Sequence, residues 1–365
     1  MKKFSFLFIF VALFFNFMTE ALAQNNNEPP DMPIDAAARS QVIENLINEL
    51  NESYIFPETA KKMESDLRAR LKNKEYEQIT SARQFSGKLT EDLQAISKDK
   101  HLNIRFSPEK IPVRAVKTEP TAEEQEQYKN SLRRNNYGFV KVENMRGNVG
   151  YIDFRGFTDP ELGAETVAAT MNFVANTDAL IFDLRNNGGG NPAMVALICS
   201  YLFGDKPVHL NDLYYRVGNK TEEYWTKPTV LGKKYGETKD VYVLTSNRTF
   251  SGAEEFANNL KALKRATIVG ETTGGGANPG DFIRLTDNFG AFVPTGRAIN
   301  PITKTNWEGT GVEPDVKVDK ESALKTAYLL ALNKSLEKAK PEGLKNALKN
   351  LIEQTQKEVN EMKKK

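Results

Sequence analysis

The sequence of 365 residues has a single cysteine, Cys199, and two histidines, His101 and His209. One cysteine excludes a disulfide framework and a cysteine-rich zinc site, and two isolated histidines form no metal-binding motif at helical or turn spacing. An excess of one charge is also missing, because 50 Lys and Arg residues oppose 48 Asp and Glu residues for a net charge of +2. We therefore expect no metal, no cofactor and no nucleic-acid partner.

Long apolar runs are missing except at the start of the chain. There Lys2 and Lys3 precede an apolar run over residues 4–18, and the small residues of Ala21-Leu-Ala follow. This order is typical of a secretory signal peptide over the first 23 residues, cleaved before Gln24. A membrane anchor is the alternative, but a span needs roughly 20 apolar residues, which is longer than this run. We expect an exported protein, periplasmic or extracellular, without a membrane span after cleavage.

The remaining chain is expected to divide into five segments. Its first residues are rich in Asn and Pro, which predicts a flexible leader. Apolar residues then recur at helical spacing, as at Val42, Leu46 and Leu50, and predict a small N-terminal helical domain. The predicted segments are a leader over 24–35, the helical domain over 36–106, a connector over 107–147, an α/β core over 148–319 and a C-terminal helical tail over 320–365.

The α/β core is predicted from apolar strands that alternate with helices. Strands that are apolar at almost every position are typical of parallel sheets buried on both faces. The turn Asp287-Asn-Phe-Gly predicts a hairpin between 282–286 and 291–294. The other expected elements are strands at 149–155, 179–185, 241–245 and 267–270, and helices at 160–175, 192–202 and 252–263.

Ser251 is expected at a strand-to-helix turn, where its hydroxyl would be exposed at the carboxyl edge of the sheet. The backbone N–H groups from Gly252 onward lack intrahelical partners, and together with the helix dipole they favour a developing negative charge. This arrangement suits an acyl-transfer nucleophile beside an oxyanion hole. A helix cap is the alternative, because Ser251 and Glu254 have the spacing of a capping box.

A glycine-rich turn, Asp183-Leu-Arg-Asn-Asn-Gly-Gly-Gly, follows another expected strand. Glycine permits positive φ and lets a backbone N–H face a cleft, so Gly188 or Gly189 could supply a second oxyanion donor. A tight turn or a phosphate nest is the alternative, although the Gly-Lys-Ser/Thr of a P-loop is missing.

His101 and the loop around Glu308 are the remaining candidates. His101 follows the predicted helical domain, and Glu308 lies among glycines and a Pro-Asp turn, a density that indicates a shaped loop. His209 is interpreted as a structural residue of an edge strand. The tyrosine-rich segment 210–237 is interpreted either as the lining of a substrate groove or as an insertion packed on the body.

Taken in order along the chain, these motifs resemble the C-terminal-processing (tail-specific) serine peptidase family. The chain is most similar to the branch that contains the tricorn protease core and the repeats of the interphotoreceptor retinoid-binding protein (IRBP). The resemblance extends over about residues 36–318 and implies a β-β-α core of the crotonase and Clp-protease kind. It is carried by Asp99-x-His, Gly-Asn-Val-Gly-Tyr-Ile-Asp-Phe, Asp-Leu-Arg-Asn-Asn-Gly-Gly-Gly, Thr-Phe-Ser-Gly-Ala-Glu-Glu-Phe, Gly-Glu-Thr-Thr-Gly-Gly-Gly-Ala and Glu-Gly-Thr-Gly-Val-Glu-Pro-Asp.

In this family the serine of the Phe-Ser-Gly motif is the nucleophile, which implies that role for Ser251. The oxyanion hole would come from Gly252 together with Gly188 or Gly189. Processing peptidases of the family pair the serine with a lysine, and Gly275 stands at that position here.

The tricorn-like branch instead uses a histidine base, which matches His101, and a glutamate, which matches Glu308. Its assisting serine corresponds to Lys100 here, so the group that orients the base departs from the family pattern, and Asp99 is a candidate replacement. The segment 107–147 is too short for the PDZ domain of the processing peptidases.

Together these residues predict a secreted or periplasmic serine peptidase that acts on peptide or protein substrates. The alternative is a non-catalytic carrier of apolar ligands, such as retinoids or fatty acids, on the same scaffold. A crotonase-like hydratase is a third class, but its chemistry does not need a serine at the start of a helix.

Overall fold

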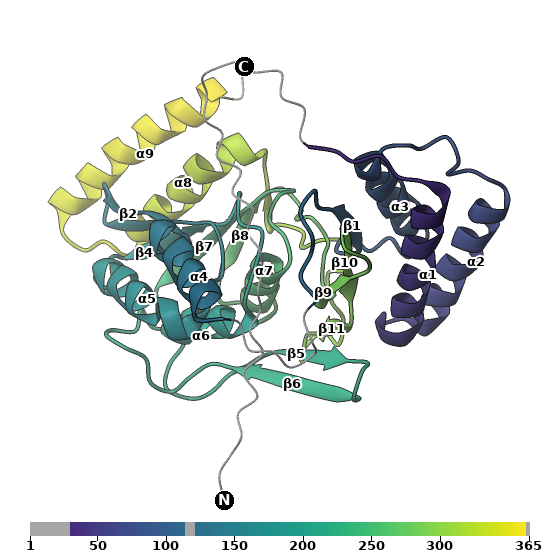
Figure 1. Ribbon diagram of the computed structural model, residues 1–365. Coiled ribbons are helices and arrows are strands. Elements are labelled where there is room, and N and C mark those ends of the chain that lie inside the picture. The colour runs from purple at the N-terminus through teal and green to yellow at the C-terminus, as the bar shows by residue number, and fades with distance from the viewer. Residues whose placement is uncertain (1–29, 114–120, 363–365) are drawn as a thin grey trace, which may run out of the picture.

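The computed structural model describes residues 30–113 and 121–362. The predicted signal peptide, its cleavage site and the first half of the leader lie outside the described residues. Within them, a lobe of three N-terminal helices stands beside a larger α/β body, and antiparallel strands lie between the two (Figure 1). This arrangement confirms the predicted α/β class with a helical N-terminal part.

The N-terminal lobe contains α1 (Ala36–Ser53), α2 (Pro57–Lys72) and α3 (Ala82–Ser97). Local signals start each helix. The Asp35 side chain accepts the amide of Ala38 in α1, Pro57 opens α2, and the Ser81 hydroxyl accepts the amide of Gln84 in α3. These are the helices that the spacing of apolar residues predicts.

The lobe packs against a small antiparallel sheet of order β1-β10-β9. Its strands are β1 (Asn103–Phe106), β9 (Gly280–Arg284) and β10 (Phe289–Pro294), the last two forming the predicted hairpin. Leu46 and Phe85 of the helices share one buried cluster with Phe289 and Val293 of the sheet. Because this core is shared, the lobe holds the segment after α3 firmly against the body.

The body is built on a six-stranded sheet of order β12-β8-β7-β4-β3-β2 among the described residues. All neighbours are parallel except β2 and β3. β4 is buried at every position, as its apolar sequence predicts. The strands are β2 (Phe139–Met145), β3 (Val149–Phe154), β4 (Ala179–Asp183), β7 (Asp240–Thr245), β8 (Thr267–Gly270) and β12 (Val316–Lys317).

Helices cover both faces of this sheet (Figure 1). One face buries α5 (Pro160–Val174), α6 (Pro192–Leu202) and α7 (Gly252–Ala262), which agree with the predicted helices to within a residue. The other face buries α8 (Lys320–Lys338) and packs on α9 (Glu342–Met362), the two parts of the predicted helical tail on either side of Pro341.

The structure differs from the expected connector over 107–147. This segment contains α4 (Ala122–Arg134), a 3₁₀ turn (Asn136–Gly138) and β2, which pairs with β3 and closes one edge of the main sheet. Because β2 buries few of its side chains and exposes Lys141, its sequence looks like polar connecting chain. Strand pairing, rather than an apolar pattern, determines this element.

The tyrosine-rich segment after α6 forms a hairpin of β5 (His209–Tyr215) and β6 (Lys220–Trp225), joined by β11 (Gly296–Ile299) in the order β11-β5-β6. The prediction of an edge strand at His209 is therefore wrong, since β5 is central. The His209 ring stacks on Trp225 at 4.2 Å, and its Nε2 lies 2.6 Å from Asp212 Oδ1. These contacts support the structural role expected for His209.

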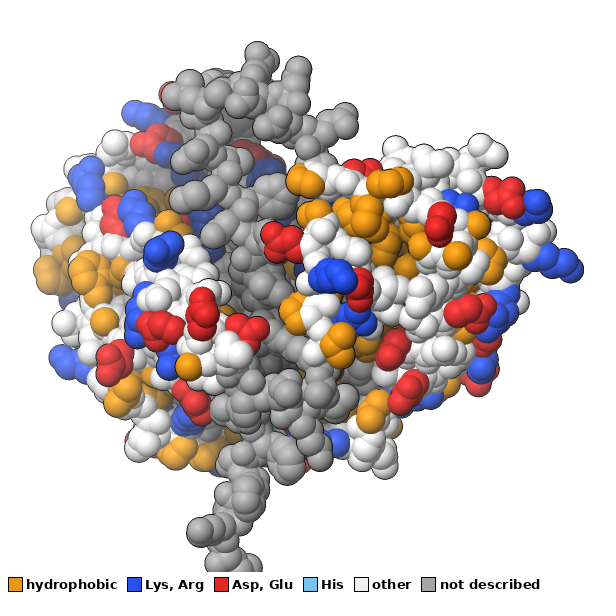
Figure 2. Space-filling view, in the orientation of Figure 1, with side chains coloured by type: hydrophobic (Ala, Val, Ile, Leu, Met, Phe, Trp, Pro, Cys, Tyr) orange, Lys and Arg blue, Asp and Glu red, His pale blue; other side chains and the backbone are white. Residues whose placement is uncertain are grey.

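Acidic and basic side chains are interspersed over the face that Figure 2 shows, as the balanced composition predicts. None of the helices in the described ranges combines the length and the apolarity that a bilayer span requires.

Candidate active site

Ser251 lies in the sharp turn between β7 and α7. Its backbone has φ 54° and ψ −124°, a combination that a non-glycine residue adopts only at a cost of about 1–3 kcal/mol. Neighbouring contacts hold the turn, since the amide of Phe250 donates to the carbonyl of Asn187 at 3.1 Å and the Thr249 hydroxyl donates to the carbonyl of Leu184 at 2.7 Å. The strained turn presents the Ser251 side chain to a pocket.

Glu254 ties this turn to the loop after β8. The side chain is fully buried, and its Oε2 accepts the amides of Ser251 (2.9 Å) and Gly276 (2.8 Å). Oε1 accepts the amide of Gly275 (2.6 Å) and the hydroxyl of Thr273 (2.5 Å). Burial raises the pKa of Glu254, and these four donors act in the opposite direction. Glu254 thus makes the carboxylate contact of the expected capping box, and it also sets the distance between two walls of the pocket.

The glycine-rich turn after β4 lies directly against Ser251 and Gly252. Gly189 has φ +99°, and a Cβ there would lie 2.6 Å from Gly252 N and 2.8 Å from Ser251 Cβ. Only glycine permits this approach. The amide of Gly189, however, donates to Asn187 Oδ1 at 2.8 Å, so it is not open as an oxyanion donor. Among the hydrogen bonds of the described residues, none uses the amide of Gly188 or of Gly252.

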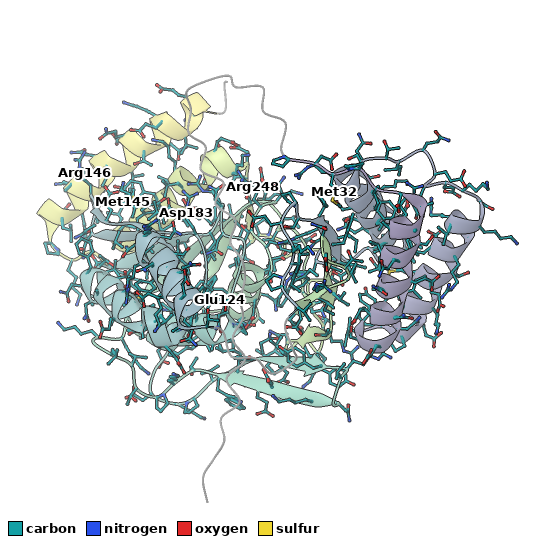
Figure 3. The ribbon with its side chains drawn as sticks, in the orientation of Figure 1. Met32, Glu124, Met145, Arg146, Asp183 and Arg248 are labelled. Carbon is teal, nitrogen blue, oxygen red and sulfur yellow. The ribbon has the colours of Figure 1, made fainter. Side chains whose placement is uncertain are left out.

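The strand end that leads into this turn is anchored by a buried ion pair. The Arg185 guanidinium donates hydrogen bonds to both carboxylate oxygens of Asp183 at 2.9 and 2.6 Å, and the Tyr151 hydroxyl donates to the same carboxylate at 2.8 Å. Figure 3 shows Asp183 inside the α/β body. These contacts fix the chain direction immediately before the glycines.

His101 reaches the same pocket from the segment between α3 and β1. Its ring packs on Phe250 at 4.5 Å and on Phe292 at 5.8 Å between ring centres. Burial lowers the pKa of His101 to about 4, so the ring is neutral at physiological pH. Nδ1 is buried without a hydrogen-bond partner and lies 3.9 Å from Asp99 Oδ1, which leaves Nε2 as the nitrogen available to a substrate-side group.

Two carboxyl groups lie behind His101. Asp99 accepts the amide of His101 at 3.0 Å and the side-chain amide of Asn278 at 2.9 Å, and Glu308 Oε2 accepts the amide of Ala277 at 2.6 Å. Burial raises the pKa of both, and for Glu308 burial and the charge of Asp99 raise it to about 8. At neutral pH, the pair of carboxyl groups therefore holds one proton.

Lys100, at the position of the family's assisting serine, has a different partner. Its ammonium donates to the carbonyl of Gly274 at 2.5 Å. Asp99, rather than Lys100, is therefore the neighbour of the imidazole. Adjacent side chains of an extended chain diverge, but the chain turns between Asp99 and His101 and brings both side chains to one side, which supports Asp99 as the candidate replacement.

A metal ion is the other group that this cluster could hold. Asp99, His101 and Glu308 offer ligand atoms that lie within 4.8 Å of one another. The expectation of no metal rested on histidine spacing along the sequence, which does not detect a cluster assembled from distant segments, and it stays a prediction.

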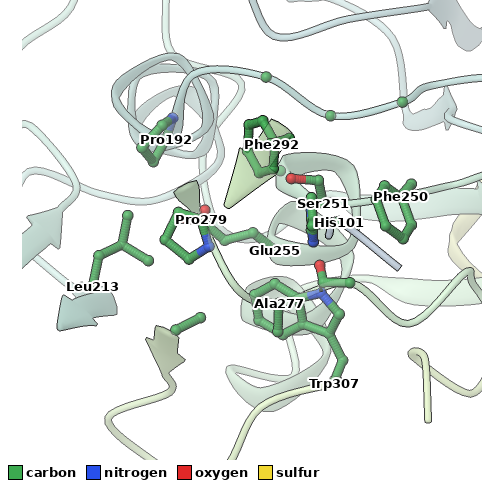
Figure 4. A pocket seen from close by; sticks show the side chains of 16 residues that line it. His101, Pro192, Leu213, Phe250, Ser251, Glu255, Ala277, Pro279, Phe292 and Trp307 are labelled. Carbon is green, nitrogen blue, oxygen red and sulfur yellow. Dashed lines mark hydrogen bonds between the residues drawn. The ribbon is translucent and has the colours of Figure 1, made fainter. Parts of the chain in front are cut away.

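A pocket of about 210 Å³ brings the predicted residues together (Figure 4). Ser251, His101, Gly188, Gly189 and Gly252 all line it, whereas Glu308 lies behind the histidine. No hydrogen bond among the described residues joins the Ser251 hydroxyl to the imidazole. The further lining residues are Gly190, Pro192, Leu213, Phe250, Glu255, Gly276, Ala277, Pro279, Phe292, Ala298 and Trp307.

Two models of known protein families match parts of this chain. Residues 148–318 match the model of peptidase family S41, and residues 36–135 match the model of the N-terminal domain of this peptidase in eukaryotic IRBP. The chain contains an S41 peptidase domain. This finding confirms the predicted resemblance to a serine-type peptidase family.

Curated relatives of the S41 domain include processing peptidases. The chain is 30% identical over 183 residues to carboxyl-terminal-processing peptidase 1, chloroplastic, of Arabidopsis thaliana, covering 50% of this chain and 36% of that protein. It is 29% identical over 181 residues to C-terminal processing peptidase, chloroplastic, of Tetradesmus obliquus, covering 47% and 36%. The chain therefore spans little more than a third of the length of these relatives.

Solved structures share the fold of the S41 chain. A crystal structure from Parabacteroides merdae, described as a candidate peptidase, aligns with a TM-score of 0.57 at 18% identity and covers 80% of this chain and 96% of that one. A lipoprotein from Streptococcus agalactiae aligns with a TM-score of 0.51 at 14% identity and covers 85% and 99%. At these identities the likeness concerns the fold alone.

Proposed function

We propose that this S41 protein is a serine peptidase in which Ser251 is the nucleophile and His101 is the general base. The observation that carries the proposal is that Ser251 and Gly252 of the β7–α7 turn and His101, from the distant segment between α3 and β1, line one pocket. The neutral state of His101 suits a base, and the strained turn keeps the Ser251 hydroxyl directed to the substrate side.

In the proposed reaction, His101 Nε2 takes the proton of the Ser251 hydroxyl as its oxygen attacks the peptide carbonyl carbon. The amides of Gly252 and Gly188 donate to the resulting oxyanion, and Gly189 allows the close approach of the two walls. The tetrahedral intermediate then collapses, the C–N bond breaks, and the protonated imidazole gives its proton to the leaving amine. Water attacks the acyl-enzyme in the same manner and restores Ser251.

Asp99 and Glu308 act through His101 in this proposal. Both face the buried side of the ring, where Nδ1 lies without a hydrogen-bond partner. As the imidazole gains a proton, a neighbouring carboxylate favours the charged form and fixes the ring orientation. Asp99 thus takes the orienting position that Lys100 cannot fill.

Labelling with a serine-directed fluorophosphonate tests the assignment. Ser251→Ala and His101→Ala are each expected to abolish labelling, because one removes the attacking oxygen and the other removes its base. The matched controls are Ser107→Ala and His209→Ala, whose side chains lie outside the pocket. Undiminished labelling of either pocket variant contradicts the proposal.

A carrier of apolar ligands is the second candidate, favoured by the aromatic lining from Phe250, Phe292 and Trp307. The size of the pocket favours the peptidase, because sites for drug-sized ligands usually enclose about 300–1,000 Å³ and this pocket encloses about 210 Å³. Casein cleavage that disappears in Ser251→Ala supports the peptidase. Stoichiometric uptake of a fluorescent fatty acid without any cleavage supports the carrier.

We also propose that the protein is exported, on the basis of Lys2, Lys3, the apolar run over 4–18 and the small residues of 21–23. Amino-terminal sequencing of the protein from its natural host is expected to begin at Gln24. An intact amino terminus starting at residue 1 contradicts export by cleavage.

A further inference from the structure

Glu255 is a carboxyl group in the pocket that the proposed chemistry does not use. It lies on α7 four residues after Ser251, so the two side chains share one helix face about one turn apart. Figure 4 shows its side chain extending into the pocket beside Ser251 and Pro279. Only 4% of Glu255 is exposed, and its Oε1 has no hydrogen-bond partner within the described part of the chain.

The surroundings of Glu255 are polar but leave it without a partner cation. Asn211 of β5 and Asn259 of α7 are fully buried and lie beside the carboxyl of Glu255. The side-chain Nδ2 and Oδ1 atoms of both asparagines make no hydrogen bond of ordinary geometry with the described residues. No ion pair within residues 30–113 and 121–362 includes Glu255. Burial raises the pKa of Glu255 to about 8. An unsatisfied buried polar group is destabilising, so a ligand that pairs with this cluster would be bound more tightly.

The walls above Glu255 are apolar. Leu213, Ala298 and Trp307 line the same pocket as the carboxyl, and the Trp307 indole is held by donating to the carbonyl of Gly276 at 2.7 Å. A lysine or arginine side chain matches this layout, because its apolar stem can pack on such walls while its cationic end reaches an acid. An entirely apolar side chain would leave the carboxyl and both amides unpaired.

We propose that this pocket receives the substrate side chain next to the scissile carbonyl, and that Glu255 makes a lysine or arginine the preferred residue there. The proposal rests on the proposed peptidase function, since it takes the Ser251 hydroxyl as the point of attack. Ser251 and Glu255 are four residues apart, about 6 Å along α7, so a substrate whose carbonyl carbon lies at Ser251 has its adjacent side chain within reach of Glu255. Glu255 releases its proton to solvent as the substrate cation enters, and the ion pair forms inside the pocket.

Two activated phosphonate esters test this specificity, one with a lysine side chain and one with norleucine, which has the same stem without the ammonium group. Because these reagents bond directly to the nucleophilic serine, their labelling rates compare the two side chains independently of any longer peptide sequence. The wild-type protein is expected to react at least about tenfold faster with the lysine reagent, as a buried charged hydrogen bond contributes well over 1.4 kcal/mol.

Glu255→Gln is expected to bring the lysine-to-norleucine ratio to about one or below, while Glu255→Asp retains a preference for lysine. Glu321→Gln, on the exposed start of α8, is the matched control with an unchanged ratio. A wild-type ratio of one or less, or a ratio that Glu255→Gln leaves unchanged, overturns the proposal, and so does failure of both reagents on a protein that a plain fluorophosphonate labels. Failure of the plain fluorophosphonate itself would instead contradict the proposed peptidase function.

Discussion

A single methyl group added at Gly189 tests how the glycine turn and the nucleophile depend on each other. In Gly189→Ala the new Cβ would lie 2.6 Å from Gly252 N and 2.7 Å from the carbonyl oxygen of Phe250, both backbone atoms, where ordinary contact starts at 3.4 Å. One wall must therefore move by about 0.8 Å, and the φ of +99° adds a strain of about 1–3 kcal/mol for a residue with a Cβ.

A shift of this size displaces the proposed oxyanion donor at Gly252. We expect kcat to fall by about 10²–10³, the cost of losing one oxyanion donor. Gly87→Ala, on the exposed face of α3 outside the pocket, is the matched control, because its added Cβ meets no atom within 4 Å and its φ is not positive. Its kcat should stay within about threefold of wild type.

The assay is hydrolysis of a fluorogenic peptide, with the thermal unfolding midpoint measured for both variants. Gly189→Ala is expected to lose both activity and thermal stability, and Gly87→Ala to retain both. Equal activity of the two variants, or a loss confined to Gly87→Ala, would refute the reasoning that steric closeness at Gly189 shapes the site.

Two further predictions concern the buried acids and the base. Because burial lowers the pKa of His101 to about 4, the ring stays neutral as the pH falls through 6.5. The acid limb of the pH profile of kcat/KM should therefore lie below pH 6.5. An acid limb at or above pH 6.5 contradicts the argument that burial lowers this pKa. Glu254→Ala leaves the amides of Ser251, Gly275 and Gly276 without their acceptor, and since each unsatisfied buried donor costs about 1–3 kcal/mol, denaturant unfolding should show a loss of at least about 3 kcal/mol. An unchanged unfolding midpoint would show that other contacts hold the turn.

Much of the fold follows from local patterns. The apolar residues of β4, the prolines that open α5 and α6, and the caps at Asp35 and Ser81 predict those elements because each signal acts within a few residues. The strand β2 was missed because its burial comes from pairing with β3, and such pairing leaves little trace in the polarity of the strand itself. The sequence around His209 likewise does not indicate that β5 lies between two other strands.

The candidate site divides in the same way. Local sequence is enough to predict the start of α7, the glycine turn and the order of motifs that resembles a peptidase family, since backbone chemistry and motif spacing are properties of short segments. Contacts between distant segments bring Asp99 and Glu308 together behind the imidazole and engage the amide of Gly189, and they leave Glu255 Oε1 without a hydrogen-bond partner among the described residues. The physical reason is that burial and electrostatic contact depend on which distant segments exclude water from one another, and no local pattern specifies that.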